Sequence, residues 1–89
     1  MSSDNEDAFD DRRAALRFLA RTRITARQLE CLAWVQRGKS ASDIGGILGI
    51  SARTVEGHLL KVCQHLEVKT RLQAVLKALD LGLIAPLEP

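Results

Sequence analysis

The feature that most constrains this sequence is the stretch from residue 42 to residue 58, SDIGGILGISARTVEGH. Gly45 supplies a small residue where a second helix can cross closely, and Gly49 follows four residues later, where a tight turn needs a residue that tolerates positive φ. Apolar residues surround both glycines, namely Ile44, Leu48, Ile50 and Val55. Two helices joined steeply through such a turn form a helix-turn-helix. Other helical proteins also contain glycine corners, so the corner alone leaves function open.

Helix starts are marked by side chains that can accept a hydrogen bond from the backbone three residues later. Thr25 and Gln28 have the spacing of a capping box, in which the glutamine also reaches back to the threonine. The other starts are Ser40 with Asp43, Ser51, and Thr70 with Gln73. They predict four helices, the first between residues 25 and 38, the second between 40 and 49, the third from 51 through 66, and the fourth from 70 to about 81.

The composition favours an all-α fold. The 89 residues are 46% hydrophobic and 3% aromatic, with no tyrosine and no valine- or isoleucine-rich run of strand length. We expect four helices in a domain over residues 24–89, preceded over residues 1–23 by an acidic disordered tail and an additional N-terminal helix. That helix should run from about Asp7 to Arg21, with Phe9, Leu16, Leu19 and Ala20 on one stripe.

Charge is distributed unevenly along the chain. Residues 1–11 contain five of the 11 acids and no base, so residues 12–89 carry 13 basic residues against six acids, a balance of +7. A basic body of this size suits a nucleic-acid partner, although many solvated helical proteins share the composition.

Several other classes of function find no support. Cys31 and Cys63 lie 32 residues apart without metal-ligand spacing, and both are expected to be buried, reduced thiols. There is no nucleophile–base pair and no phosphate-binding loop, so we expect no enzyme and no cofactor. The absence of a long apolar stretch and the acidic N-terminus argue against a membrane span and a signal peptide, which predicts a cytoplasmic protein.

From Ile24 to Ile84 the sequence resembles the LuxR-type, also called GerE-type, helix-turn-helix domain of bacterial regulators. ITARQLECL is similar to its opening segment, SDIGGILGISARTVEGHL to its central motif and HLEVKTRLQAVLKALDLGLI to its closing segment. WVQRGKSASDIGGILGIS is more similar to the acyl-homoserine-lactone quorum-sensing branch, especially at Cys31, Trp34 and the run from Gly38 to Ser40.

The resemblance implies a domain whose third helix enters the major groove and whose fourth helix pairs two copies on an inverted repeat. The half-sites would lie about one helical turn, roughly 34–36 Å, apart. Quorum-sensing members carry a large autoinducer-binding domain before this module, whereas 23 residues precede it here. We therefore expect no small-molecule pocket, and either a stand-alone effector domain or a piece of a larger regulator.

The third helix supplies most candidate DNA-binding residues. Arg53 can reach guanine or a phosphate, and Thr54 can donate to a phosphate. Glu56 can accept from cytosine N4 or be an ordinary surface residue; the family commonly has basic residues at Glu56 and Leu60. Gly57 costs about 1 kcal/mol relative to alanine in a helix, which close approach of DNA or of another chain would explain.

Further contacts are expected around the third helix and at helix starts. His58 fits a structural or phosphate-contacting role, because no metal-ligating residues accompany it at suitable spacing. The other phosphate candidates are Lys39, Ser40, Ser51, Lys61, Lys69 and Arg71. Each charge among them also fits an ordinary solvated side chain.

The fourth helix has two apolar stripes. Ala74, Val75, Ala78 and Leu81 should face the core, whereas Leu72, Leu76 and Leu79 form a second stripe. A twofold pair of such helices would bury the second stripe as a dimer interface. The alternative is that the N-terminal helix covers these leucines.

Two functions follow as predictions. The first is a sequence-specific regulator of transcription that binds double-stranded DNA as a homodimer through its third helix. The alternative is an interaction module that heterodimerises through Leu72, Leu76 and Leu79 with a full-length LuxR-type regulator and modulates it.

Overall fold

The computed structural model describes residues 12–17, 19–21 and 23–88. Its helices are α2 (Ala26–Gln36), α3 (Ala41–Leu48), α4 (Ala52–Leu66) and α5 (Arg71–Asp80). Residues 12–17 and 19–21 are helical as well, and no strand occurs in the described part of the chain. The prediction of an all-α fold with four helices and a further N-terminal one is confirmed.

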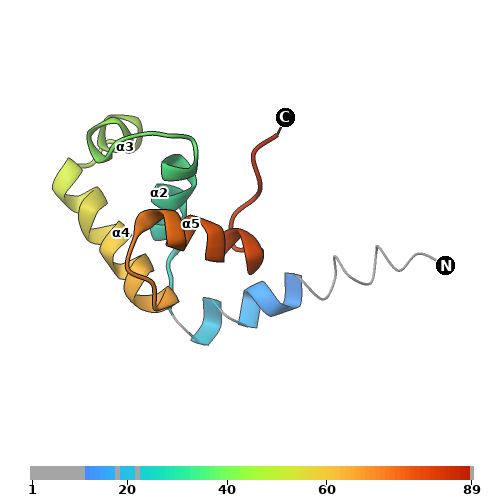
Figure 1. The fold of residues 1–89 in the computed structure, drawn as a ribbon. Helices are drawn as coiled ribbons and strands as arrows, with labels where there is room; N and C mark the ends of the chain where they lie inside the picture. The colour runs from blue at the N-terminus through green and yellow to red at the C-terminus, as the bar shows by residue number, and fades with distance from the viewer. Residues whose placement is uncertain (1–11, 18, 22, 89) are drawn as a thin grey trace.

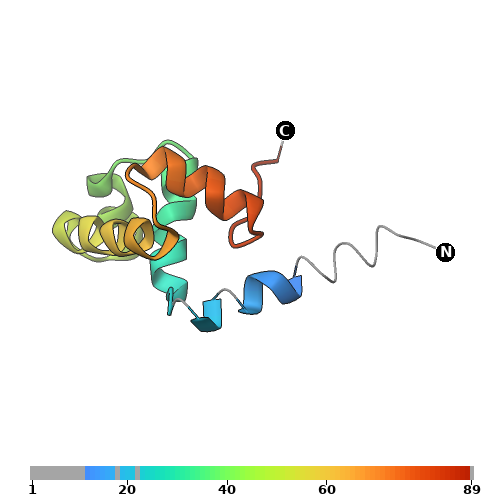
Figure 2. The ribbon, with the colours of Figure 1, turned by 60° about the horizontal axis from the view of Figure 1, so that its bottom comes forward.

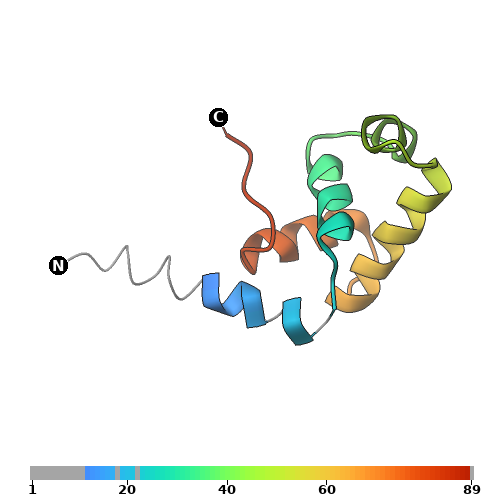
Figure 3. The same ribbon diagram turned by 180° about the vertical axis from the view of Figure 1, so that it is seen from behind.

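Helix α2 stands at the centre of the domain and contacts α3, α4 and α5 (Figures 1 and 3). Helix α3 packs across one end of α4, and α5 packs on both α2 and α4. Every third or fourth residue of α4 is buried, as expected for a helix with one face on the core. The fully buried core side chains include Cys31, Leu32, Ile44, Val55, Val62 and Leu66.

All three capping boxes form as the sequence predicts. The amide of Gln28 donates to Thr25 Oγ1 at 3.1 Å, and the amide of Thr25 donates to Gln28 Oε1 at 3.1 Å. The same reciprocal pairs form between Ser40 and Asp43 and between Thr70 and Gln73. These bonds satisfy amides that have no partner inside the helix, so each helix begins where its cap stands.

The corner between α3 and α4 depends on two glycines. Gly49 ends α3 with φ 71° and ψ 33°, in the left-handed region that favours glycine. The amide of Ile50 donates to the carbonyl of Gly45 at 3.0 Å. A Cβ at Gly45 would lie 2.5 Å from the Ile50 carbonyl oxygen, so this position admits no side chain without movement of the backbone. The predicted helix-turn-helix is present.

The connection from α4 to α5 contains a left-handed residue and a side-chain hydrogen bond. Glu67 ends α4 in the left-handed conformation with φ 57°, a conformation that residues other than glycine rarely adopt. The Lys77 ammonium of α5 donates to the Leu66 carbonyl at 2.7 Å, at the end of α4 where carbonyl oxygens lack helical partners.

The helical residues 12–17 and 19–21 lie near the C-terminal end of α5 (Figure 2). Leu19 packs against the core and Ala15 is buried. The predicted stripe is wrong in two positions, because Leu16 is 61% exposed and Ala20 is also exposed. The predicted disordered tail, the start of this helix at Asp7 and the role of Phe9 lie outside the described residues.

Candidate nucleic-acid interface

Helix α4 has one face in the core and the opposite face in solvent. Val55, Leu59, Val62 and Leu66 are each at most 2% exposed. At 100° per residue, Arg53, Gly57 and Lys61 lie on the side away from these residues, and all three are exposed. The structure therefore brings the two predicted cations of this helix to one surface, with Gly57 between them.

The start of α4 is held by two hydroxyl side chains. The amide of Thr54 donates to Ser51 Oγ at 3.0 Å, and the two hydroxyl oxygens are hydrogen-bonded at 2.9 Å. Ser51 therefore acts as the cap of α4. Both residues are exposed at the helix N-terminus, where backbone amides and the helix dipole favour an anion.

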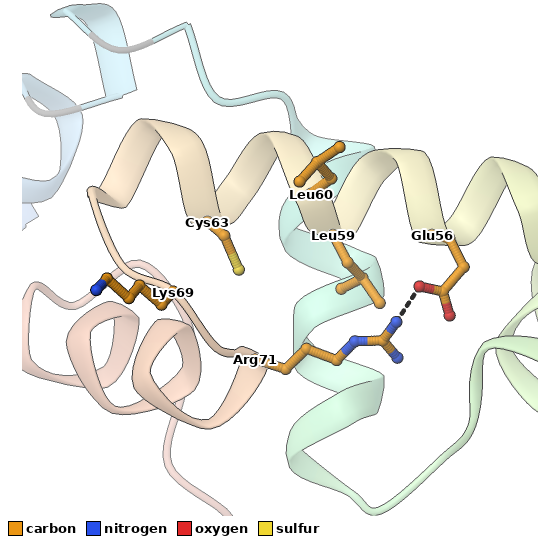
Figure 4. A pocket seen from close by; sticks show the side chains of 6 residues that line it. All are labelled: Glu56, Leu59, Leu60, Cys63, Lys69 and Arg71. Atoms are coloured by element: carbon orange, nitrogen blue, oxygen red, sulfur yellow. Dashed lines mark hydrogen bonds and ion pairs between the residues drawn. The ribbon is translucent and has the colours of Figure 1, made fainter.

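Glu56 and Arg71 form an ion pair between α4 and the start of α5 (Figure 4). The Glu56 side chain points toward α5, and the Arg71 guanidinium points toward Glu56. Both residues line a shallow cavity of about 170 Å³. Their side chains are 51% and 40% exposed, so solvent screens much of the attraction. Two residues predicted as separate DNA contacts thus contact each other.

Some of the remaining candidates are exposed to solvent, and others contact the rest of the fold. Lys39, Lys61 and Lys69 are exposed, whereas His58 is half-buried. Ser40 caps α3 together with Asp43. The amide and side chain of Ser40 hold the pKa of the Asp43 carboxyl below its ordinary value, because both bond to the charged form.

One residue of the same surface was missed in the sequence. Gln64 is exposed and lies seven residues after Gly57, two helical turns along the outer side of α4. Its side chain can donate and accept, and glutamine pairs with adenine in the major groove. The 3.6-residue period of the buried positions is the signal that could have identified it.

Helix α5 exposes part of its predicted second stripe. Leu72 is 67% exposed and Leu76 is 57% exposed, so the described N-terminal residues do not cover them. Leu79 differs, because it is half-buried and packs against the core. Leu72 and Leu76 are therefore the largely exposed members of the predicted dimer stripe, and Leu79 is its partly buried member. The inward stripe is as predicted, with Ala74, Val75 and Ala78 buried and Leu81 packed against the core.

Neither cysteine has the surroundings of a reactive thiol. Cys31 is buried and Cys63 half-buried, and burial raises the pKa of both thiols. Within residues 12–17, 19–21 and 23–88, no three metal-ligating side chains gather at one place. No helix in that part of the chain is long and apolar enough to cross a membrane.

Comparison with known proteins agrees with this geometry. The family model described as bacterial regulatory proteins of the luxR family matches residues 22–78, which is more than half of the chain. The chain belongs to this family. The members of this family are described as regulatory proteins, and the relatives reported below are transcriptional regulators and not enzymes. No solved structure gives a significant match.

Several curated relatives are similar to most of this chain. The transcriptional activator protein VanR of Vibrio anguillarum is 44% identical over 63 residues, which are 71% of this chain and 26% of VanR. The HTH-type quorum sensing-dependent transcriptional regulator RpaR of Rhodopseudomonas palustris is 46% identical over 66 residues, 74% of this chain and 27% of RpaR. The transcriptional activator protein LuxR of Aliivibrio fischeri is 46% identical over 61 residues, 68% of this chain and 24% of LuxR. The chain thus spans about a quarter of the length of these relatives.

Proposed function

We propose that this chain regulates transcription by inserting α4 into the major groove of double-stranded DNA. The observation that carries the proposal is the outer side of α4, where Arg53, Gly57 and Lys61 are exposed opposite a buried face. The corner at Gly45 and Gly49 fixes the start of this helix closely against α3. An α-helix fits the major groove, and the family membership supports this use of the corner.

Electrostatics favour a DNA partner. Among the described residues, no acidic side chain pairs with Arg53 or Lys61, and the carboxylate of Glu56 is paired with Arg71. The outer side of α4 is therefore positive, and it can release counterions from the phosphates. Lys39 and Lys69 add exposed charge near the starts of α3 and α5.

We further propose that the chain acts as a homodimer on an inverted repeat. Leu72 and Leu76 lie one helical turn apart on α5 and are largely exposed. A twofold axis through this patch would place the same two leucines of each copy against each other. Each copy would then present one α4 to one half-site, roughly 34–36 Å from the other.

The same leucines support the rival function. They can pair with the corresponding helix of a longer luxR-family regulator, and a heterodimer would then modulate that regulator. The exposure of Leu60, 60% on α4 where a basic residue would favour DNA, fits such a module. In either case we propose a role in bacterial quorum-sensing transcription, which the name of the relative RpaR supports, and we propose that this role is carried out in the cytoplasm.

DNA binding is tested by gel shift with fragments of the source genome, at low and at moderate salt. Arg53→Ala should weaken binding to the preferred fragment, whereas Lys61→Ala should weaken all fragments alike and reduce the salt slope by about one unit. Arg27→Ala is the control, since that arginine pairs with Glu30 on α2. No retardation of any fragment at low salt would reject DNA binding.

Dimer formation is tested by sedimentation of the wild type and of Leu72→Ala with Leu76→Ala. The double variant should remain folded, because both side chains are mainly in solvent, but should sediment as a monomer and lose affinity for an inverted repeat. Mixing the chain with a full-length luxR-family regulator distinguishes the homodimer from the rival interaction module. A heterodimer that prevents DNA binding would favour the interaction module.

A further inference from the structure

Gly57 is unexplained by the packing of the described chain. It lies inside α4, where glycine is less favourable than every residue except proline. A Cβ built at this position meets no atom within 4 Å, and its φ is not in the left-handed region. Neither crowding nor backbone conformation therefore requires glycine here.

Gly45 gives the opposite result in the same motif. A Cβ there would lie 2.5 Å from a backbone oxygen, so the fold itself excludes a side chain. No such neighbour exists at Gly57, so a molecule that contacts α4 from outside is the remaining source of any requirement for glycine there.

The position of Gly57 indicates which molecule this is. Arg53 and Lys61 lie four residues before and after it on the outer side of α4. Eight residues at 1.5 Å each separate these cations by about 12 Å along the helix axis, comparable with the width of the major groove, about 12 Å. The neighbouring Glu56 points toward Arg71, with which it forms an ion pair (Figure 4).

We propose that Gly57 is the point of closest approach between the α4 backbone and the bases, and that it sets specificity by keeping this point free of a side chain. The inference rests on the proposed function and adds to it a specificity-determining position. Any side chain at residue 57 holds the helix further out, so Arg53 and Lys61 no longer reach the DNA together. The cations on both sides favour DNA over a second protein chain at this surface.

The test compares Gly57→Ala with Gly46→Ala. Gly46 is a matched control, because it is an exposed helical glycine of α3 whose added Cβ also meets nothing within 4 Å. The probes are a duplex selected by the wild-type chain from a random-sequence pool and a scrambled duplex of equal composition. Thermal unfolding, Kd for both duplexes and sedimentation are measured for each variant.

Both variants should gain stability, with Tm raised by about 4–8 °C, because alanine replaces glycine in a helix. Only Gly57→Ala should raise Kd for the selected duplex, by about tenfold, similar to one mismatched base pair. Binding of the scrambled duplex should change less, since it depends mainly on phosphates.

Four outcomes overturn the inference. In the first, Gly57→Ala binds the selected duplex as tightly as the wild type. In the second, Gly46→Ala weakens binding equally, and in the third, Gly57→Ala lowers Tm, which would reveal an internal role for the glycine. In the fourth, Gly57→Ala changes the oligomeric state alone, which would assign the surface to a protein partner. Failure of the wild type to select any duplex would instead reject the proposed function.

Discussion

The two ends of α4 are connected to their neighbours in different ways. At the α3–α4 corner, a backbone oxygen occupies the space where Gly45 would carry a side chain. At the α4–α5 junction, the Lys77 ammonium on the Leu66 carbonyl and the Glu56–Arg71 ion pair add polar contacts to the apolar packing of the core. The first connection depends on the close approach of two backbone segments, whereas the second includes a side-chain hydrogen bond and a partly exposed ion pair.

This difference separates folding from function. Close-packed contacts tolerate little change in volume, whereas exposed ion pairs contribute at most about 1 kcal/mol. Adding a side chain at Gly45 should therefore cost more stability than removing one of the polar contacts at the junction. The junction is where the role of α4 can be altered without loss of the structure.

The largest effect is expected for Gly45→Ala. The added methyl group forces the start of α4 away from α3, and a net loss of about 2 kcal/mol in the free energy of unfolding should remain after the gain in helix propensity. Urea unfolding followed by circular dichroism measures it. Gly46→Ala, the adjacent control, should instead stabilise by about 1 kcal/mol. Equal effects of the two alanines would contradict the steric account of the corner.

A smaller loss is expected for Lys77→Met. Methionine keeps most of the apolar stem but cannot donate to the Leu66 carbonyl, so the free energy of unfolding should fall by about 1 kcal/mol. Lys61→Met, which removes an exposed ammonium from α4, should change it by less than about 0.5 kcal/mol. If both variants unfold at the same urea concentration, the hydrogen bond does not hold the junction.

The Glu56–Arg71 pair should affect DNA affinity more than stability. In a double-mutant cycle with Glu56→Gln and Arg71→Gln, the coupling in unfolding free energy should be below about 1 kcal/mol. Glu56→Gln should lower Kd for all duplexes by roughly threefold, since it removes a negative charge near phosphates. Fluorescence anisotropy measures the Kd of both variants for each duplex. A loss confined to sites with one particular cytosine would instead show that Glu56 reads that base.

The smallest effect concerns acid and the start of α3. The pKa of Asp43 is lowered in the fold, so its contribution is present above the unfolded pKa of about 3.9 and is lost as pH falls through the folded value. Asp43→Asn keeps an acceptor for the Ser40 amide but does not titrate. Between pH 6 and pH 3 the unfolding midpoint of the wild type should therefore fall more steeply than that of the variant. If the unfolding midpoints of the two proteins fall equally with pH, the charge of Asp43 does not stabilise the cap.

Local sequence was sufficient for the helix starts and the corner. The bonds of a capping box join residues three apart, so Thr25 with Gln28 and Thr70 with Gln73 could be recognised without any knowledge of the fold. The positive φ at Gly49 follows from the same short range. The buried face of α4 followed from its 3.6-residue period.

Contacts between helices could not be obtained in this way. Glu56 and Arg71 lie 15 residues apart, and Lys77 lies 11 residues from Leu66. Whether such side chains meet depends on the angle at which two helices cross, which periodicity does not specify. The same reason applies to Leu79. Its position on the helix predicted an exposed side chain, whereas packing against the core leaves it half-buried.

The sequence by itself thus determined where the helices begin, how α3 turns into α4, and which side of α4 is available to a partner, because each depends on residues a few positions apart. Only the tertiary structure decided that Glu56 is paired, that Leu72 and Leu76 are exposed without Leu79, and that Gly57 has no neighbour. These features depend on how elements distant in sequence pack together. They leave Arg53, Gly57 and Lys61 as the surface on which the proposed function depends.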